Sequence, residues 1–188
     1  MVGDAQRHGF EPQAADAVIS RLGIMFFDDF TAALANLRAA TKPGGRFAAV
    51  IWLPKDRSPL HYRAVTVAVD TAGARGWRID PGPPDAGPFG FASGTTLNAL
   101  ADAGWDNGRI EPHRVWLYAG GPGAKPAVVA HDFFMPQIRS LLAGAPEGTV
   151  AAVEQAVARD FEGYWDRTGV RLDAMIAILT AQAGSGRP

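Results

Sequence analysis

The chain has 188 residues, of which 47% are hydrophobic and 20% are charged, and its formal net charge is −1. This length and apolar content suffice for one sizeable core, so we expect one domain, or a domain with a small subdomain. The near-zero charge and the scattered arginines argue against a nucleic-acid partner and favour a small molecule. The sequence contains no cysteine, which excludes disulfides, thiolate metal sites and a cysteine nucleophile.

The apolar runs of the chain are short. The longest, 47–53 and 174–179, fall well below the roughly 20 residues that span a bilayer. The N-terminal residues are polar and lack the apolar segment and cleavage site of a signal peptide. We therefore expect a cytoplasmic protein without a membrane span. The four histidines show no spacing typical of metal ligands, so we expect no metal site.

Two short apolar segments, 16–21 and 46–52, are typical of strands that are buried on both faces. Between them, four apolar residues repeat at the spacing of a helix: Phe30, Ala33, Leu34 and Leu37. The Pro-Gly-Gly sequence at 43–45 ends this helix and turns the chain into the second strand. The order predicts two parallel strands joined by a right-handed helical crossover.

The middle of the chain alternates helix signals with loop signals. Apolar residues at helical spacing predict a helix within 58–76. The next segment, 80–94, is rich in proline and glycine, and a long loop in a compact domain usually forms a lid or a binding loop. A short helix over 97–101 precedes a strand over 109–118, in which Pro112 indicates an edge or a bulge.

The last third predicts helices followed by one more strand. Pro126 suits the first turn of a helix, which Pro136 restarts or kinks. Apolar residues on one face predict a further helix over 150–164. Alternating apolar residues over 170–178 predict a strand that becomes more buried toward its end. Residues 184–188 have the composition of a disordered tail.

Several of these segments, in this order, resemble a known family. The matching sequences are Gly3-Asp4-Ala5-Gln6, DAVISRLGIMFFDDF at 16–30, LRAATKPGGRFAAVIW at 37–52, GPFGFAS at 87–93 and GVRLDAMIAILTAQ at 169–182. Together they resemble the class I S-adenosylmethionine-dependent methyltransferases, in particular the ubiquinone/menaquinone-biosynthesis-like group. The resemblance covers nearly the whole chain, is most specific over 4–52 and is weaker over 58–94.

The resemblance implies an α/β fold with a partial Rossmann-like methyltransferase sheet. Residues 1–183 would form the C-terminal portion of the domain, with a helical and loop insert at about 58–94. The chain would supply the fourth to seventh strands, the last of them antiparallel. The family's Gly-rich loop and its ribose-binding acidic residue belong to strands that this sequence does not contain. We therefore expect the isolated chain to bind S-adenosylmethionine weakly or not at all.

The resemblance also implies an adenine-binding loop at Asp4, Ala5 and Gln6. The Asp4 carboxylate would accept a hydrogen bond from the adenine amino group, and the Ala5 backbone N–H would donate one to the ring. An isolated aspartate of this kind is alternatively a turn residue or a helix N-cap.

A second part of the implied cofactor site follows the first strand, at Ser20, Arg21 and Leu22. These residues would face the methionine part of the cofactor. Ser20 and Arg21 alternatively cap the strand and pair with solvent or with Asp28. Methyl transfer from a sulfonium mainly requires alignment of the nucleophile, the methyl carbon and the sulfur, together with exclusion of water.

Aromatic residues close to the predicted loop are candidates for an apolar acceptor pocket, or equally for the core: Trp52, Tyr62, Phe89 and Phe91. His61, beside Tyr62, is a candidate base for a substrate that must lose a proton. The sequence thus predicts a methyltransferase that acts on a small apolar or aromatic acceptor. The alternative is a non-catalytic, methyltransferase-like remnant that serves dimerisation or binds a small ligand. An unprotected edge at 16–21 further predicts a homodimer or a partner chain that covers this strand.

Overall fold

The structure is a computed structural model that describes residues 3–184, apart from the side chain of Phe133. Residues 185–188 of the predicted disordered tail therefore lie outside the described residues. Two compact units divide the chain. Within the described residues, the sheet unit comprises 3–54, 85–113 and 175–184, and the helical unit comprises 55–84 and 114–174. The insert expected at 58–94 therefore contributes residues to both units.

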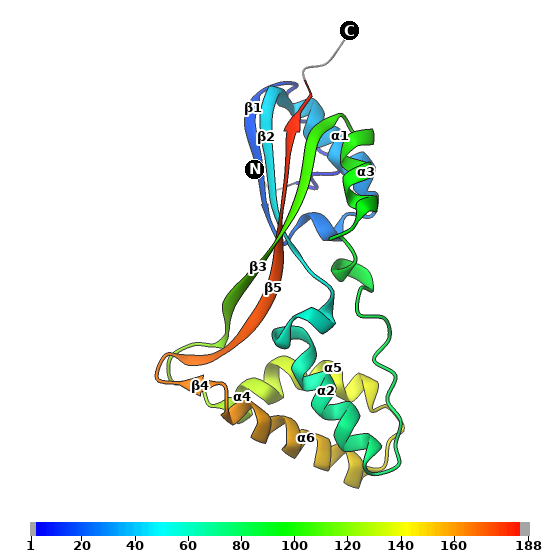
Figure 1. Ribbon diagram of the computed structural model, residues 1–188, viewed down its shortest axis with the longest axis vertical. Helices are drawn as coiled ribbons and strands as arrows, with labels where there is room; N and C mark the ends of the chain where they lie inside the picture. The colour runs from blue at the N-terminus through cyan, green and yellow to red at the C-terminus, as the bar shows by residue number, and fades with distance from the viewer. Residues whose placement is uncertain (1–2, 185–188) are drawn as a thin grey trace. The chain divides into compact units, whose positions relative to one another are not determined.

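The predicted crossover is present at the start of the sheet unit (Figure 1). β1 (Ala15–Arg21) leads through a short 3-10 turn, η1 (Ile24–Phe26), to α1 (Phe30–Ala40), and β2 (Thr41–Trp52) follows at once. β1 and β2 are parallel, which confirms the prediction. The Pro-Gly-Gly sequence lies inside β2 rather than before it. Ala15 pairs with Thr41 but Ala17 pairs with Arg46. The register therefore shifts, and the Pro-Gly-Gly sequence forms a bulge at the start of β2.

Two long strands complete the sheet. β5 (Gly169–Ala183) is antiparallel to β2, and β3 (Trp105–Gly120) lies beyond β5, in the order β1-β2-β5-β3. A two-residue strand, β4 (Trp165–Asp166), pairs with β5. The mixed α/β sheet with its antiparallel last strand confirms the predicted fold class. Pro112 lies in β3, which is an edge strand, as the sequence predicts.

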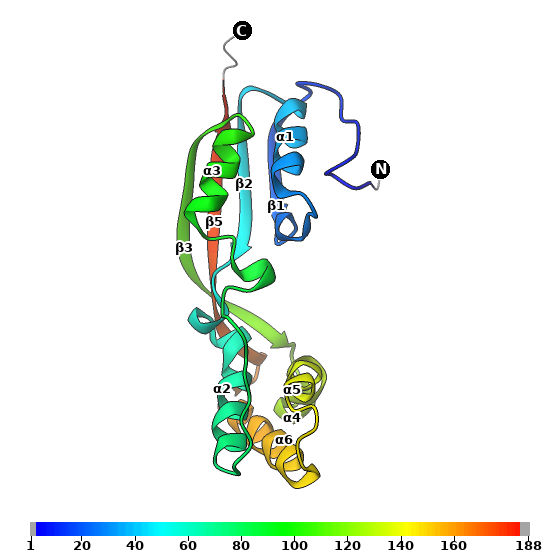
Figure 2. The ribbon, with the colours of Figure 1, turned by 90° about the vertical axis from the view of Figure 1, so that its right-hand side faces the viewer.

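The core of the sheet unit lies between one face of the sheet and two helices, α1 and α3 (Gly94–Asp102), which Figure 2 shows in front of the strands. Its largest buried members are Ile24, Leu34, Phe47, Ile51, Leu100, Trp105 and Leu179. The indole Nε1 of Trp105 donates a hydrogen bond to the Leu34 carbonyl oxygen at 3.0 Å, which satisfies the polar atom of a side chain only 1% exposed. The segment before α3 contains a short 3-10 turn, η3 (Gly87–Phe89).

The helical unit begins with a 3-10 turn, η2 (Lys55–Arg57), and contains the other helices that the sequence predicts. They are α2 (Pro59–Gly73), α4 (Pro126–Val129), α5 (Met135–Leu141) and α6 (Glu147–Glu162). A π-helical turn, Ala130–Phe134, separates α4 from α5, and Pro136 is the second residue of α5, so the predicted interruption is present. α2 packs against α6, where Arg63 and Asp160 form a two-pronged ion pair. No helix in the described part of the chain combines the length and the apolar character needed to cross a bilayer.

Candidate functional site

A turn formed by residues 4–8 contains the predicted adenine-binding residues. The Asp4 carbonyl oxygen accepts hydrogen bonds from the backbone N–H groups of Arg7 and His8, at 3.0 and 2.8 Å. Oδ1 of the Asp4 side chain accepts another from the N–H of Gln6 at 2.9 Å. Asp4 is therefore a turn aspartate, as the alternative interpretation states. Its second carboxylate oxygen, Oδ2, lies 3.9 Å from Nε of Arg7, and the side chain is 57% exposed.

Two contacts attach this turn to α1. The side-chain amide of Asn36 donates to the carbonyl oxygens of Ala5 and His8, both at 2.9 Å. Oε1 of Gln6 accepts from the backbone N–H of Asp29 at 3.0 Å. Asp29 is the N-cap of α1, and its Oδ1 accepts from the N–H of Ala32 at 2.9 Å. Because α1 begins just after the carboxyl end of β1, the turn lies at that end of the strand.

Asn36 was not predicted as a site residue, although the sequence holds a signal for it. It stands three residues after Ala33 and four before Ala40, both of which are buried. A polar side chain on the buried stripe of a helix needs hydrogen-bond partners, and the carbonyl groups of the turn supply them. The sequence alone does not reveal which segment offers those partners.

The carboxyl end of β1 holds the second predicted set. Leu22 donates its backbone N–H to the Val50 carbonyl oxygen at 3.0 Å, which ends the pairing with β2. Its φ of 55° lies in the left-handed region, where a residue other than glycine is strained. Strain of this kind is often retained at functional sites. Arg21 is exposed and, among the described residues, forms no ion pair with Asp28 or any other carboxylate.

Three of the aromatic candidates belong to the sheet unit. Trp52 ends β2, and its backbone N–H points to Sδ of Met25 at 3.3 Å. Phe89 ends η3, which contacts both β2 and η1. Phe91 packs edge-on against Phe30, with 5.0 Å between the ring centroids. Leu22, Trp52 and Phe91 are all half-buried against the core, so part of each side chain is accessible.

The structure therefore brings together segments that are distant in the sequence. The turn at 4–8, the end of β1, η1 and η3 all lie at or beside the carboxyl ends of the two parallel strands. In open α/β sheets this is the edge where ligands bind.

His61 and Tyr62 belong to the helical unit, near the start of α2. Burial, and to a smaller extent the positive charge of Lys55, together lower the pKa of His61 from 6.5 to about 4. The imidazole is therefore neutral at pH 7 and can accept a proton, but it is a weaker base than an ordinary histidine.

A surface hollow of about 470 Å³ lies beside the turn, and the sequence analysis did not anticipate it. Its lining residues are Gly3, His8, Gly9, Phe10 and Glu11. The rings of His8 and Phe10 meet edge-on, with 4.7 Å between their centroids. Phe10 is 38% exposed, so this hollow offers a flat apolar surface next to Asp4. Over residues 3–184, no three or more acidic or histidine side chains are grouped so as to hold a metal ion.

Residues 1–49 match the sequence model of a family described as a methyltransferase domain. No curated protein sequence matches the chain. Among solved structures, a candidate methyltransferase from Bacillus halodurans is 14% identical with a TM-score of 0.50, over 97% of this chain and 70% of that one. A candidate methyltransferase of an antibiotic biosynthesis pathway in Anabaena variabilis is 14% identical with a TM-score of 0.51, over 96% of this chain and 72% of that one.

A third structure, a Haemonchus contortus phosphoethanolamine N-methyltransferase in complex with S-adenosylmethionine, is 13% identical with a TM-score of 0.42. The match covers 96% of this chain but only 36% of that protein. The first two structures share the fold of this chain, which spans about 70% of their length. The chain therefore matches a methyltransferase domain over residues 1–49 and shares the fold of these two candidate methyltransferases over nearly all of its length.

Proposed function

We propose that this chain is the C-terminal, substrate-side portion of an S-adenosylmethionine-dependent methyltransferase that acts on a small apolar or aromatic acceptor. In this proposal residues 1–183 belong to one methyltransferase domain with an insert at about 58–94. The supporting observation is the convergence of the turn at 4–8 with the carboxyl end of β1, which the bond between Gln6 and Asp29 maintains.

The turn offers the donor and the acceptor that an adenine ring requires. The backbone N–H of Ala5 forms no hydrogen bond with any residue in the described part of the chain. Gln6 uses only Oδ1 of Asp4, and Oδ2, which lies 3.9 Å from Nε of the exposed Arg7, accepts no hydrogen bond within the described residues. An adenine that receives a bond from Ala5 and donates its amino hydrogen to Asp4 would satisfy both groups.

The methionine part and the acceptor would lie along the end of the sheet. Ser20, Arg21 and Leu22 would line the methionine part, and the cation of Arg21 suits its carboxylate. The accessible portions of Trp52 and Phe91, with Phe89, would form an apolar surface for the acceptor. The bound cofactor supplies a methyl group on a good leaving group, so these residues need only align the acceptor and exclude water.

The edge of β1 supports the proposal of a second polypeptide. β1 is an edge strand, and Ile19 on it is 83% exposed. An apolar edge with unpaired backbone groups invites pairing with another strand, from a second copy or from a partner chain. The same edge supports the second candidate function, a non-catalytic module that dimerises or binds a small ligand.

Amide chemical-shift mapping tests the cofactor site even if binding is weak. Millimolar S-adenosylmethionine should shift the amides of residues 4–6 and 20–22 in the purified chain, and adenosine alone should shift only the first group. Asp4→Asn should abolish the adenosine shifts. Asp80→Asn is the matched control, because the Asp80 side chain accepts the N–H of Gly82 at 2.9 Å in the same kind of turn.

Two results of this experiment would count against the proposal, and one further measurement tests the expected weak affinity. Shifts confined to other residues would overturn the site, and an Asp4→Asn variant that binds like the parent would remove the adenine role. Micromolar affinity measured by calorimetry would contradict the expectation that the isolated chain binds the cofactor weakly.

A further inference from the structure

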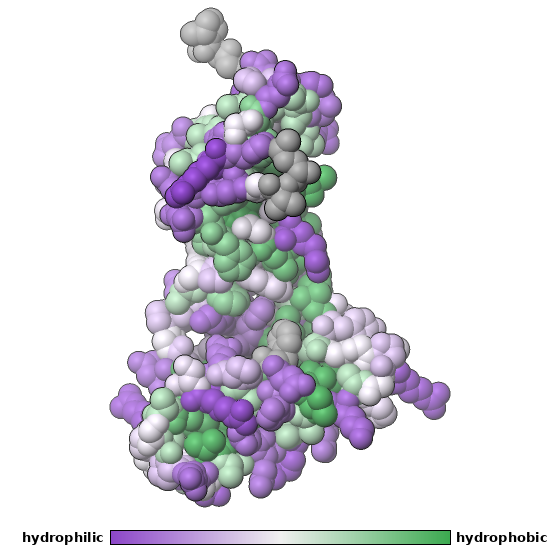
Figure 3. Space-filling model, turned by 180° about the vertical axis from the view of Figure 1, so that it is seen from behind, coloured by the Kyte–Doolittle hydropathy of each residue, from purple (hydrophilic) through white to green (hydrophobic). Residues whose placement is uncertain are grey.

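The helical unit has a surface hollow that the proposed function does not use. Its volume is about 220 Å³, and it lies between α6 and the segment that runs from α4 through the π-helical turn into α5. On the face of this unit that Figure 3 shows, apolar patches are small and lie among polar residues. A folded partner needs a larger apolar surface, so the hollow is suited to a small molecule.

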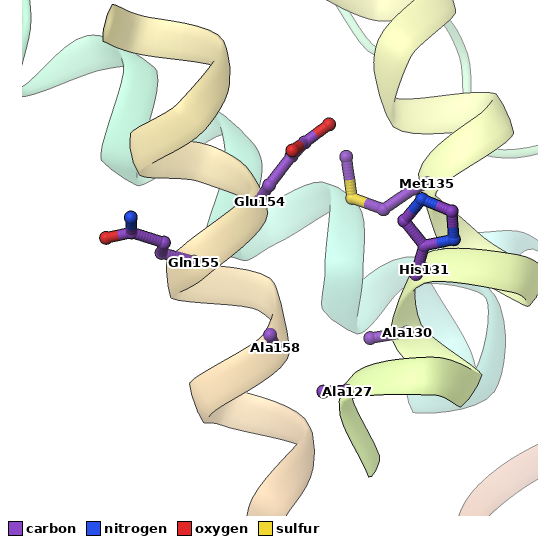
Figure 4. Close-up of a pocket in the computed structure, with 7 residues that line it drawn as sticks. All are labelled: Ala127, Ala130, His131, Met135, Glu154, Gln155 and Ala158. Carbon is purple, nitrogen blue, oxygen red and sulfur yellow. The ribbon is translucent and has the colours of Figure 1, made fainter. Parts of the chain in front are cut away.

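Small and apolar side chains form the floor of the hollow. Ala158 of α6 faces Ala127 and Ala130 across the gap in Figure 4, and the side chain of Met135 points toward α6 beside them. Ala130 and Met135 are only 1% and 2% exposed, so the floor reaches the buried side of these helices. Packed protein interiors leave few gaps larger than a water molecule. Short alanine side chains on both sides of this gap explain why no neighbouring side chain fills it.

A chain of polar contacts runs along the rim of the hollow. Nδ1 of His131 lies 2.8 Å from Oδ1 of Asp132. Nε of Arg139 donates to Oε1 of Glu154 at 2.8 Å. A second nitrogen of this guanidinium lies 3.4 Å from Nε2 of His131, beyond the usual hydrogen-bond range of about 2.7–3.2 Å. His131 and Glu154 both line the hollow, so this long contact lies at its edge.

The π-helical turn places His131 at the rim. A π turn adds one residue to a helical turn, and such turns are rare and frequently lie at functional sites. Here the first residue of the turn, Ala130, belongs to the floor and the second, His131, to the rim. The turn thus presents an apolar and a polar side chain to the same hollow.

The rim is suited to an uncharged hydroxyl group. When Nδ1–H of His131 donates to Asp132, Nε2 keeps its lone pair and is an acceptor. A hydroxyl can donate to Nε2 and accept from the Arg139 guanidinium, and both side chains are exposed enough, at 60% and 49%, to move apart and admit it. Glu154 would repel an anion, and Arg139 would repel a cation.

We propose that the hollow binds a small uncharged molecule that has one apolar ring and one hydroxyl group. The ring would cover the alanines and Met135, and the hydroxyl would bridge His131 and Arg139. Size limits the ring, because an apolar cavity of about 150 Å³ holds benzene. The hollow of about 220 Å³ therefore admits one ring with few further atoms. The site is independent of methyl transfer, so it can hold whether or not the cofactor site does.

Phenol and toluene test the hydroxyl, because they are nearly equal in size and differ by a hydroxyl against a methyl group. In the purified chain labelled with ¹³C at alanine and methionine methyl groups, phenol should shift the signals of Ala158 and Met135. We expect phenol to bind about fivefold more tightly than toluene, benzoate or benzylamine. No shift with phenol, equal affinities for phenol and toluene, or tighter binding of either charged compound would overturn the proposal.

Two variants test the floor and the rim separately. Ala158→Leu fills the hollow and should weaken the binding of phenol and toluene about tenfold, whereas Ala151→Leu, at an exposed position of the same helix, should not. His131→Phe removes the acceptor and should lower the affinity for phenol about fivefold, with toluene binding unchanged. His113→Phe, at an exposed histidine of the sheet unit, is the matched control. Parental phenol affinity in Ala158→Leu or His131→Phe would assign phenol to another place and overturn the site.

Discussion

The side-chain oxygen of Gln6 accepts a hydrogen bond from the backbone N–H of Asp29 at 3.0 Å, across 23 residues of sequence. The bond connects the turn that holds the predicted adenine contacts to the N-cap of α1. Because the N-terminus of α1 follows the carboxyl end of β1, a local turn becomes part of the edge where α/β sheets bind ligands. The predictions below test the contacts on which this arrangement and the two units depend.

Asn36→Ala should release the turn from α1. The variant removes two hydrogen bonds at 2.9 Å to the carbonyl oxygens of Ala5 and His8, and each such bond contributes about 1 kcal/mol. We expect the free energy of unfolding to fall by about 2 kcal/mol in urea, and the amides of residues 5–8 to exchange faster with deuterium. Asn98→Ala, at an exposed position on α3, is the control and should change neither quantity. Unaltered deuterium exchange in the Asn36 variant would show that the turn is stable without the hydrogen bonds of Asn36.

Arg63→Lys should weaken the packing of α2 against α6. Nε of Arg63 donates to Oδ2 of Asp160 at 2.8 Å, and a second guanidinium nitrogen contacts Oδ1. Lysine keeps the charge but cannot form the two parallel bonds, and Asp160 is only 17% exposed. We expect a loss of about 1–2 kcal/mol in guanidinium unfolding. Arg159→Lys changes an exposed arginine of α6 and should have no effect. Equal stability of the two variants would mean that solvent compensates for the two lost hydrogen bonds between Arg63 and Asp160.

The stability of the chain should depend on the protonation of His61. Its folded pKa of about 4 lies below the ordinary value of 6.5, so between these limits the unfolded state binds more protons. The contribution of neutral His61 to the free energy of unfolding is therefore fully present above pH 6.5 and is lost as the pH falls toward 4. Between pH 7.0 and pH 5.0, the free energy of unfolding in urea should fall less for His61→Gln than for the parent. For His131→Gln, which changes an exposed histidine, this fall in free energy should equal that of the parent. An NMR titration that placed the pKa of His61 near 6.5 would contradict this prediction.

Ile19→Lys should reduce association through the edge of β1. The side chain is 83% exposed, so lysine costs little folding free energy there, and a charge on an edge strand opposes pairing. We expect light scattering to show a dimer or larger species for the parent and a monomer for the variant. Val128→Lys alters a side chain that is 53% exposed in the helical unit and should leave the association unchanged. A parent that is monodisperse and monomeric would argue against association at this edge.

Local patterns in the sequence were sufficient for most elements of the fold. The apolar segments at 16–21 and 46–52, with a helical stripe between them, correctly predicted a parallel crossover, because strand and helix periodicity are local properties. Pro112 correctly indicated an edge strand, since proline lacks the N–H that a central strand needs. The bulge at 43–45 escaped prediction because it depends on how Ala15 and Ala17 align with β2.

The amino-acid sequence by itself determined the α/β class, the order of the elements and the resemblance of the opening segment to a methyltransferase. Only the tertiary structure decided that Asn36 and Gln6 attach the turn to α1, that Phe91 packs on Phe30, and that one face of the sheet remains uncovered by α1 and α3. The physical reason is the distance along the sequence over which each interaction acts. Periodicity, proline and glycine act over a few residues, whereas hydrogen bonds between distant segments and the cover of a sheet depend on which surfaces meet after folding.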